Sequence, residues 1–343
     1  MKYLKLISLI LLVFFKTGTI FSNENIFNVN NIEIKKGNNI NNEAAANMAI
    51  KEGFKTLIKR ILLHEDKNKL STLNLNQIKE LVSYYQTKRV KNSVTYSISF
   101  DKEKLHKIFY TSEISYSDIS DKEIYLLPVL DDNEQLNIFN NNFFYQKWNN
   151  FGENNLIEFI LPLENIEIIQ NINSNKNSIF DLDLRNLFQE YSNKNLCLLV
   201  IQLKKNSLQA KVFLKTKILG KNISKNIIVK KTNNDKISLN EKIIIEAKNE
   251  LENIIKSQNL VDVRTPSFLN VKLILENDND LVELNKRLKK IESIENIFVQ
   301  EFNNKYIFLK MKYLGKITKI IKQLENQKIL IKESGGQWSL KII

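Results

Sequence analysis

The chain is poor in the residues that build several common kinds of site. Its 343 residues include one cysteine and two histidines. A disulfide framework and a cysteine-based structural zinc site are therefore excluded, and few side chains remain for histidine metal sites. With eight glycines and three prolines there is also little room for flexible linkers. A hydrophobic fraction of 43% and a charged fraction of 26% are those of a globular protein.

Sequence motifs for catalysis are missing as well. Neither GxGxxG nor GxxxxGK[ST] occurs, and there is no GxSxG nucleophile elbow. Cys197 lies within the apolar run Leu196–Leu203 and is expected to pack as a small hydrophobe. His64, at the end of a predicted helix, and His106, beside two lysines, are expected to be structural. We therefore predict no catalytic residue, no metal site and no cofactor.

The N-terminus has the layout of a secretory signal peptide. Lys2 and Lys5 precede the apolar run Leu6–Phe15, which Lys16 ends. This run is about half the roughly 20 residues that cross a bilayer as a helix. We predict that residues 1–22 are a cleaved signal peptide and that the protein is periplasmic or secreted. The alternative is an uncleaved N-terminal membrane anchor.

The sequence that follows residue 22 predicts an α+β or α/β protein of three small modules. Residues 23–118 form an N-terminal βααβα module. Its long helix, Glu43–Leu63, contains Gly53, which indicates close packing because glycine lowers helix stability. A second helix is predicted over Gln77–Gln86 and a strand over Val94–Phe100.

The middle module, residues 119–265, is predicted to be an α/β layer with a hairpin and a long helix. Aromatic residues crowd Asn140–Phe151 and predict a helix that covers the core. The run Leu196–Leu203 is typical of a strand buried on both faces. The hairpin spans 208–231, and the helix covers Leu239–Gln258 with Asn240 or Ser238 as its cap.

The last module, residues 266–343, has the clearest pattern. Strands are predicted at Leu269–Leu275, Ile297–Phe302, Tyr306–Met311 and Trp338–Ile342, and helices at Asp280–Ile291 and Ile317–Leu324. The order β–α–β–β–α–β is that of a ferredoxin-like module.

Several of these segments, in this order, resemble a known family. They are the helix Glu43–Leu63, the strand Val94–Phe100, Leu127–Pro128, the later Trp148, and a closing segment with Leu284, Leu288, Ile294, Ile297 and Val299. The chain resembles uncharacterised exported proteobacterial proteins of domain-of-unknown-function family twenty sixty-six. The resemblance implies an envelope location and three small α/β pieces, and it supplies no catalytic residues. The middle module also looks like the α/β domains of periplasmic assembly proteins.

A lysine-rich hairpin carries much of the formal net charge of +13. Between Lys204 and Lys236 there are ten lysines and one acid. Alternation along a strand predicts a candidate anion-binding face composed of Lys211, Lys215, Lys217, Lys221, Lys225 and Lys230. The alternative is that these lysines protect an exposed sheet edge. Arginine is scarce, which argues against sequence-specific nucleic-acid recognition.

Three groups of carboxylates complete the set of candidates: Asp131–Asp132–Glu134, Asp181–Asp183 and Asp278–Asp280. The last two are expected to cap helices. The first is the basis of an alternative hypothesis, an exported hydrolase. The favoured hypothesis is a non-enzymatic envelope protein that binds a protein partner or an anionic envelope polymer, with contact to a membrane surface as a further expectation. A third hypothesis is a non-specific polyanion or nucleic-acid binder.

Overall fold

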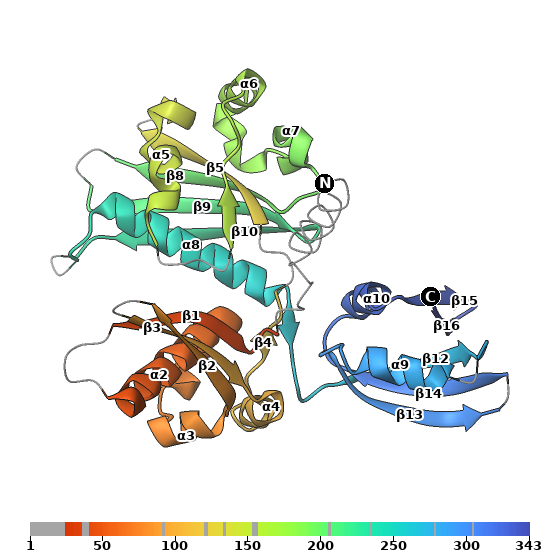
Figure 1. Ribbon diagram of the computed structural model, residues 1–343. Helices are drawn as coiled ribbons and strands as arrows, with labels where there is room; N and C mark the ends of the chain where they lie inside the picture. Colours follow the sequence, from red (N-terminus) through yellow and green to blue (C-terminus); the bar gives the residue numbers. More distant parts are fainter. Residues whose placement is uncertain are drawn as a thin grey trace, which may run out of the picture. The chain divides into compact units, whose positions relative to one another are not determined.

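The structure is a computed structural model, and it describes residues 25–35, 41–90, 93–119, 123–132, 135–152, 157–204, 207–232, 235–277, 279–303 and 305–343. The expected signal peptide, residues 1–22, lies outside them. The chain divides into two compact units, and Figure 1 labels their helices and strands. The first takes in the chain up to Ile61, Asp66–Tyr116 and Val261–Ile343, and the second takes in Leu62–Glu65 and Ser117–Leu260. The N-terminal and C-terminal segments, predicted as separate modules, thus belong to one unit.

The N-terminal part of the first unit is a small antiparallel sheet with a helix packed on it. Strands β1 (Asn28–Lys35), β3 (Ser93–Phe100) and β2 (Val82–Val90) pair in the order β1-β3-β2. Alternate residues of β3, from Val94 to Phe100, are buried towards the long helix α2 (Asn42–Ile61). The order of elements differs from the predicted βααβα because β2 is an additional strand.

The second predicted helix is shorter than expected. Helix α3 covers only Leu75–Glu80, and its N-cap Asn74 forms a reciprocal capping box with Gln77. The predicted continuation to Gln86 is wrong, because the chain from Val82 onward pairs with β3 along its length. Valine, tyrosine and threonine there favour a strand.

Gly53 marks a close approach of α2 to the sheet, as the sequence predicts. A Cβ atom placed on Gly53 would lie 2.8 Å from Cδ1 of Ile32 and 2.9 Å from Cδ1 of Ile98. Both distances are shorter than ordinary carbon–carbon contacts. The glycine therefore lets the helix backbone lie directly on β1 and β3.

The second unit is built on a six-stranded mixed sheet of order β10-β9-β8-β5-β6, with β7 also paired to β5. The strands are β5 (Glu123–Asp132), β6 (Gln135–Asn137), β7 (Glu158–Ile160), β8 (Leu196–Leu203), β9 (Gln209–Ile218) and β10 (Lys221–Lys230). Strands β7, β5 and β8 are parallel, and β9 and β10 form the predicted hairpin. Leu219 and Gly220, both with positive φ, make its turn.

Both faces of this sheet are covered, as Figure 1 shows. Helix α8 (Leu239–Ser257) and helix α5 (Phe143–Lys147) form one core with the sheet, and α6 (Ile166–Ser174) and α7 (Leu184–Leu187) form the other. Strand β8 is buried on both sides, which confirms that prediction. The aromatic segment is confirmed as a core cover, since Phe144 and Trp148 are fully buried. Ser238 is confirmed as the cap of α8.

The C-terminal part of the first unit is a five-stranded sheet of order β13-β14-β12-β16-β15. Its elements are β12 (Ser267–Ile274), α9 (Asp280–Leu288), β13 (Ile294–Phe302), β14 (Tyr306–Tyr313), α10 (Ile317–Asn326), β15 (Ile329–Ser334) and β16 (Gln337–Ile342). The two helices and the inward side chains of the strands share one hydrophobic core. We call residues 267–343 the C-terminal module.

The C-terminal module departs from the predicted ferredoxin-like order after α10. An additional strand, β15, follows this helix and takes the edge of the sheet. The last strand, β16, inserts between β15 and β12 and runs parallel to β12. The turn at Gly335–Gly336, where both residues have positive φ, joins β15 to β16 as a hairpin. The C-terminal module therefore has one strand more than predicted, and the fold of the chain is α+β.

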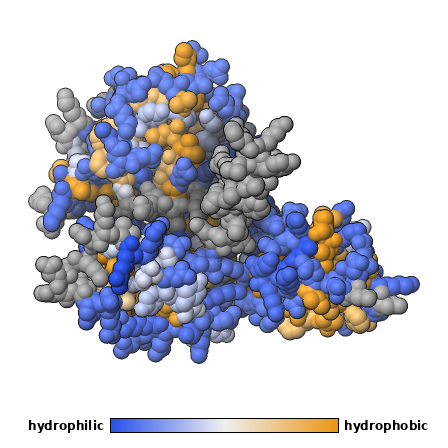
Figure 2. Space-filling view, in the orientation of Figure 1, coloured by the Kyte–Doolittle hydropathy of each residue, from blue (hydrophilic) through white to orange (hydrophobic). Residues whose placement is uncertain are grey.

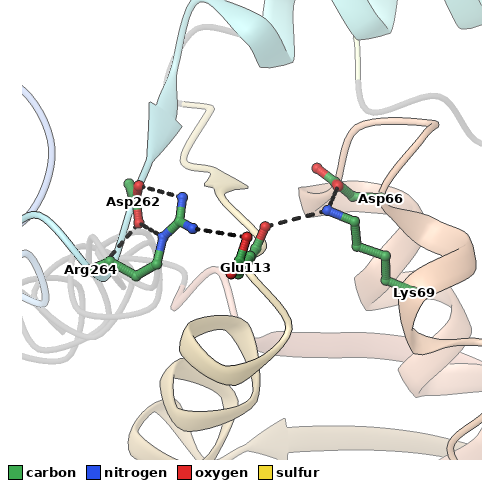
Figure 3. Close-up of polar contacts among 5 residues, drawn as sticks. All are labelled: Asp66, Lys69, Glu113, Asp262 and Arg264. Carbon is green, nitrogen blue, oxygen red and sulfur yellow. Dashed lines mark hydrogen bonds and ion pairs between the residues drawn. The ribbon is translucent and has the colours of Figure 1, made fainter.

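A chain of polar contacts in the first unit joins the segment after α4 (Lys102–Thr111) to the segment before β12 (Figure 3). The Arg264 guanidinium donates to both carboxylate oxygens of Asp262, and these bonds lower the pKa of Asp262. Nη1 of Arg264 lies 3.8 Å from Oε2 of Glu113. The backbone carbonyl of Glu113 accepts a hydrogen bond from the Lys69 ammonium, and this ammonium also pairs with the Asp66 carboxylate.

In the part of the chain that the structure describes, no helix is both long and apolar enough to cross a membrane.

Candidate ligand-binding face

The six hairpin lysines do not share one face of the sheet. Strands β9 and β10 are antiparallel, and Lys221 lies opposite Ile218 while Lys225 lies opposite Leu214. Opposed residues point to the same side of a sheet. Lys221 and Lys225 therefore point to the α8 side, and Lys211, Lys215, Lys217 and Lys230 point to the other. The prediction of one continuous lysine face is wrong, because odd-numbered residues of the two strands point in opposite directions.

Several of these lysines are held by local contacts. Lys217 is 7% exposed, so it lies in the sheet rather than on the surface. The Lys215 ammonium donates to the carbonyl of Phe180 at 3.0 Å, and Lys225 pairs with Glu250 on α8. Strand β9 is interior, so the edge-protection alternative applies only to the lysines of β10. The hairpin is therefore a weak candidate for an anion-binding face.

The carboxylate groups are also dispersed. Asp131 and Asp132 are consecutive residues of β5, so their side chains point to opposite faces of the sheet. Glu134 and Asp278 lie outside the described residues. Asp183 accepts a bond from the backbone of Arg185 and caps α7, as predicted. No group of three or more metal-ligating side chains occurs among the residues that the structure describes.

An open depression of about 620 Å³ lies at the carboxyl ends of the parallel strands β5 and β8. Its lining includes Asp131, Gln202, Lys204, Ser207 and Lys211. Ligands often bind at this end of a parallel sheet. The Gln202 amide, however, donates to the Asp131 carboxylate at 3.1 Å. Two of the polar groups that line the depression are therefore bonded to each other, which makes it less suited to a ligand.

The buried titratable side chains have structural surroundings. His106 is buried against the rings of Phe27 and Tyr116, with Nδ1 3.5 Å from Oε1 of Glu295. Burial, and then the charge of Lys102, lower the pKa of His106 to about 4. Cys197 is fully buried, and burial raises the pKa of its thiol. The predicted burial of Cys197 is confirmed. His64 is exposed and follows the last residue of α2.

The outer side of the C-terminal sheet, opposite the two helices, combines aromatic rings with lysines. On β14, the inward residues Ile307, Leu309 and Met311 are buried, and the outward positions alternate with them. We define the outer sheet face by its outward residues on the three strands β13, β14 and β12. They are Asn296, Phe298 and Glu301 on β13, Tyr306, Phe308, Lys310 and Lys312 on β14, and Phe268, Asn270, Lys272 and Ile274 on β12.

Two lysines of the outer sheet face lie over aromatic rings. The Lys272 ammonium is 4.3 Å from the ring centroid of Tyr306 and 5.7 Å from that of Phe308. The Lys310 ammonium is 4.6 Å from the ring centroid of Phe268. Both are within the range of a cation–π interaction. Neither lysine has an ion-pair partner among the described residues, whereas Lys312 pairs with Glu295 at 3.0 Å.

Two aromatic residues of this face are exposed to solvent, and Tyr306 and Phe308 are partly buried. Phe268 is 50% exposed and Phe298 is 47% exposed. Figure 2 shows hydrophobic residues at the surface on the side of the C-terminal module where β13 lies. The hydroxyl of Tyr306 donates to Oε1 of Glu301 at 2.9 Å, which fixes the orientation of its ring. Where exposed rings lie beside cations, the rings can stack on flat groups of a ligand while the cations neutralise its anionic groups.

The outer sheet face was not predicted from the sequence. The signal was present in Tyr306–Tyr313, where two aromatic residues and two lysines alternate with buried apolar residues. An aromatic side chain at an outward strand position is a departure from a simple inside–outside pattern. The sequence pattern does not show which strands lie beside β14. The outward residues that β12 and β13 add to this face could therefore not be predicted.

Comparison with known proteins gives no relative for this chain. No family model matches it, and no curated protein and no solved structure is significantly similar. The resemblance to family twenty sixty-six therefore stays a prediction.

Proposed function

We propose that this protein is a non-enzymatic binding protein that is exported to the cell envelope and holds an extended anionic polymer. The export rests on the N-terminal layout of the sequence, and the binding rests on the outer sheet face. The single observation that carries the proposal is the pair of lysines, Lys272 and Lys310, held over aromatic rings without an ion-pair partner among the described residues.

The charges of this face suit a linear polyanion. Lys272 and Lys310 lie on neighbouring strands, so two cations are presented side by side. Lys332 on β15 points to the same side and is exposed. A polymer that neutralises such cations gains free energy by releasing its own condensed counterions. The open side of a five-stranded sheet offers an extended surface rather than an enclosed pocket.

The exported-hydrolase alternative has less support. Its two described acids, Asp131 and Asp132, point to opposite faces of β5 and cannot flank one substrate bond. Carboxylate pairs that act together in hydrolysis lie within about 10 Å of each other on either side of the bond. The outer sheet face brings together more groups that could contact one ligand, namely its lysines and aromatic rings, than the Asp131–Asp132 pair does.

The proposal is tested by measuring the affinity of the purified chain for inorganic polyphosphate across a range of salt concentrations. The test variant is Lys272→Gln with Lys310→Gln, and the matched control is Lys221→Gln with Lys230→Gln on β10. We expect the test variant to bind at least tenfold more weakly and with a salt slope smaller by roughly 1.4, since each contact contributes about 0.7. The control should bind as the unmodified chain does. Equal losses in both variants, or no binding by the unmodified chain, contradict the proposal.

A further inference from the structure

We infer that the anionic polymer held on the outer sheet face is single-stranded nucleic acid, bound without regard to its sequence. This inference rests on the proposed function and narrows it to one ligand class. It follows from three features of the face: the positions of the rings, the positions of the cations, and the polar groups between them. This chemistry is the same in whichever compartment the chain occupies.

The rings are spread over three neighbouring strands. Phe298 lies opposite Lys310 on β14, and Phe268 lies opposite Lys312 on the other side of the same strand. Tyr306 and Phe308, two residues apart on β14, have ring centroids separated by 5.1 Å. Unstacked bases can stack on exposed rings, and every base has a π-face, so such contacts do not depend on sequence. An anionic polymer without bases would make no use of these rings.

The cations lie over the rings rather than around the border of the face. Lys272 is close to the rings of Tyr306 and Phe308, and Lys310 is close to that of Phe268. In a single strand, bases and phosphates alternate along the chain. A surface that alternates rings and ammonium groups therefore matches this ligand better than it matches an anion without flat groups.

Polar side chains on the same face favour nucleic acid over a lipid surface. Asn270 lies opposite Lys310, and Asn296 lies opposite Lys312. Amide groups can bond to base edges and to sugar hydroxyls. At a membrane surface the same groups would be buried against acyl chains without partners, which is costly.

A double helix is disfavoured as the ligand. Its bases are stacked on each other, so their flat faces are not accessible to the rings of a protein. Reading the major groove requires a helix or a two-stranded ribbon that enters it, whereas this face is the open side of a five-stranded sheet. The bases must therefore be unpaired to use Phe268 and Phe298.

The test compares the affinities of the full purified chain for four probes. They are a short oligothymidylate, an abasic oligonucleotide of equal length, the same oligothymidylate paired with its complement, and phosphatidylserine vesicles. The test variant is Phe268→Leu with Phe298→Leu, which keeps exposed apolar side chains but removes two flat rings. The matched control is Tyr84→Leu, since Tyr84 is 56% exposed on β2 of the N-terminal sheet.

We expect the unmodified chain to bind the oligothymidylate at least tenfold more tightly than the abasic oligonucleotide and the duplex. The test variant should lose this preference while it keeps its affinity for the abasic probe, and the control should keep both. Equal affinities for the oligothymidylate and the abasic probe overturn this inference but leave the proposed function standing. Tighter binding to the vesicles than to the oligothymidylate assigns the face to a membrane and overturns the inference. Loss of all binding to anions overturns both.

Discussion

The ammonium of Lys272 lies 4.3 Å from the ring centroid of Tyr306, on the neighbouring strand. The Tyr306 hydroxyl donates in turn to Glu301 on the strand beyond it. Three strands of the C-terminal sheet are thus linked on their outer side by a cation, a ring and a carboxylate. This linkage positions the lysine before any ligand arrives, which reduces the entropy cost of binding.

Removing this cation should affect binding far more than folding. A cation–π pair at an exposed site is worth about 0.5–1 kcal/mol. We therefore expect Lys272→Gln to lower the free energy of unfolding by about 1 kcal/mol or less in a urea titration. A loss of several kcal/mol would mean that Lys272 is part of the structural core, and it would exclude Lys272 from the proposed binding site.

Gly53 gives a sharper stability prediction. A side chain at this position meets Ile32 and Ile98, which are both buried. Inserting atoms into a packed core costs typically 1–3 kcal/mol, and a leucine exceeds one added methyl group by far. We expect Gly53→Leu to lower the free energy of unfolding by at least about 2 kcal/mol. Lys51→Leu, on the exposed side of the same helix, is the control and should change it by less than about 1 kcal/mol.

The buried imidazole of His106 predicts acid sensitivity. Its pKa is about 4 in the folded chain and about 6.5 in the unfolded chain. The unfolded state therefore binds more protons between these values, so stability is fully present above pH 6.5 and is lost as the pH falls towards 4. The loss should reach about 3 kcal/mol.

The measurement compares the unmodified chain with His106→Phe, because phenylalanine cannot titrate and fits beside the rings of Phe27 and Tyr116. Urea titrations at several pH values give the difference in unfolding free energy between the two chains. We expect the unmodified chain to lose stability relative to the variant as the pH falls from 7 to 4. A difference that does not vary with pH would show that His106 is not buried in its neutral form.

The single thiol offers a simple test of burial. Cys197 is fully buried in the interior strand β8, and the pKa of its thiol is raised by that burial. A thiol reagent needs an accessible thiolate. We expect a colorimetric thiol reagent to leave the native chain unmodified over the time in which it reacts fully in urea. Rapid reaction of the native chain would show that β8 is accessible.

The buried strands and the helix caps were predictable from the sequence because their signals are local. The continuous apolar run Leu196–Leu203 is typical of a strand that is covered on both faces. Ser238 followed by Glu241 is the pattern of a capping box. Gly53 in the middle of an amphipathic helix pointed to close packing for the same reason, since a helix keeps a glycine there only at some cost.

The features that were not predicted from the sequence depend on which strands lie next to each other in the sheets. Strand β2 looked like the end of a helix because its pairing with β3 decides its conformation. Strand β15 was overlooked because its pairing with β16 places it at the edge of the sheet. The hairpin lysines were assigned to one face because the register of β9 with β10 was unknown. The outer sheet face draws residues from positions up to 44 apart, from Phe268 to Lys312, so no local pattern shows it whole.

Amide hydrogen exchange of the purified chain, with and without a short oligothymidylate, shows which strands hold the bound single strand. We expect added protection in β12 and β14, at Ser267–Ile274 and Tyr306–Tyr313, and unchanged exchange in the lysine hairpin, Gln209–Lys230. Added protection in the hairpin with none in the C-terminal sheet would contradict this expectation and return the binding site to the lysines of β9 and β10.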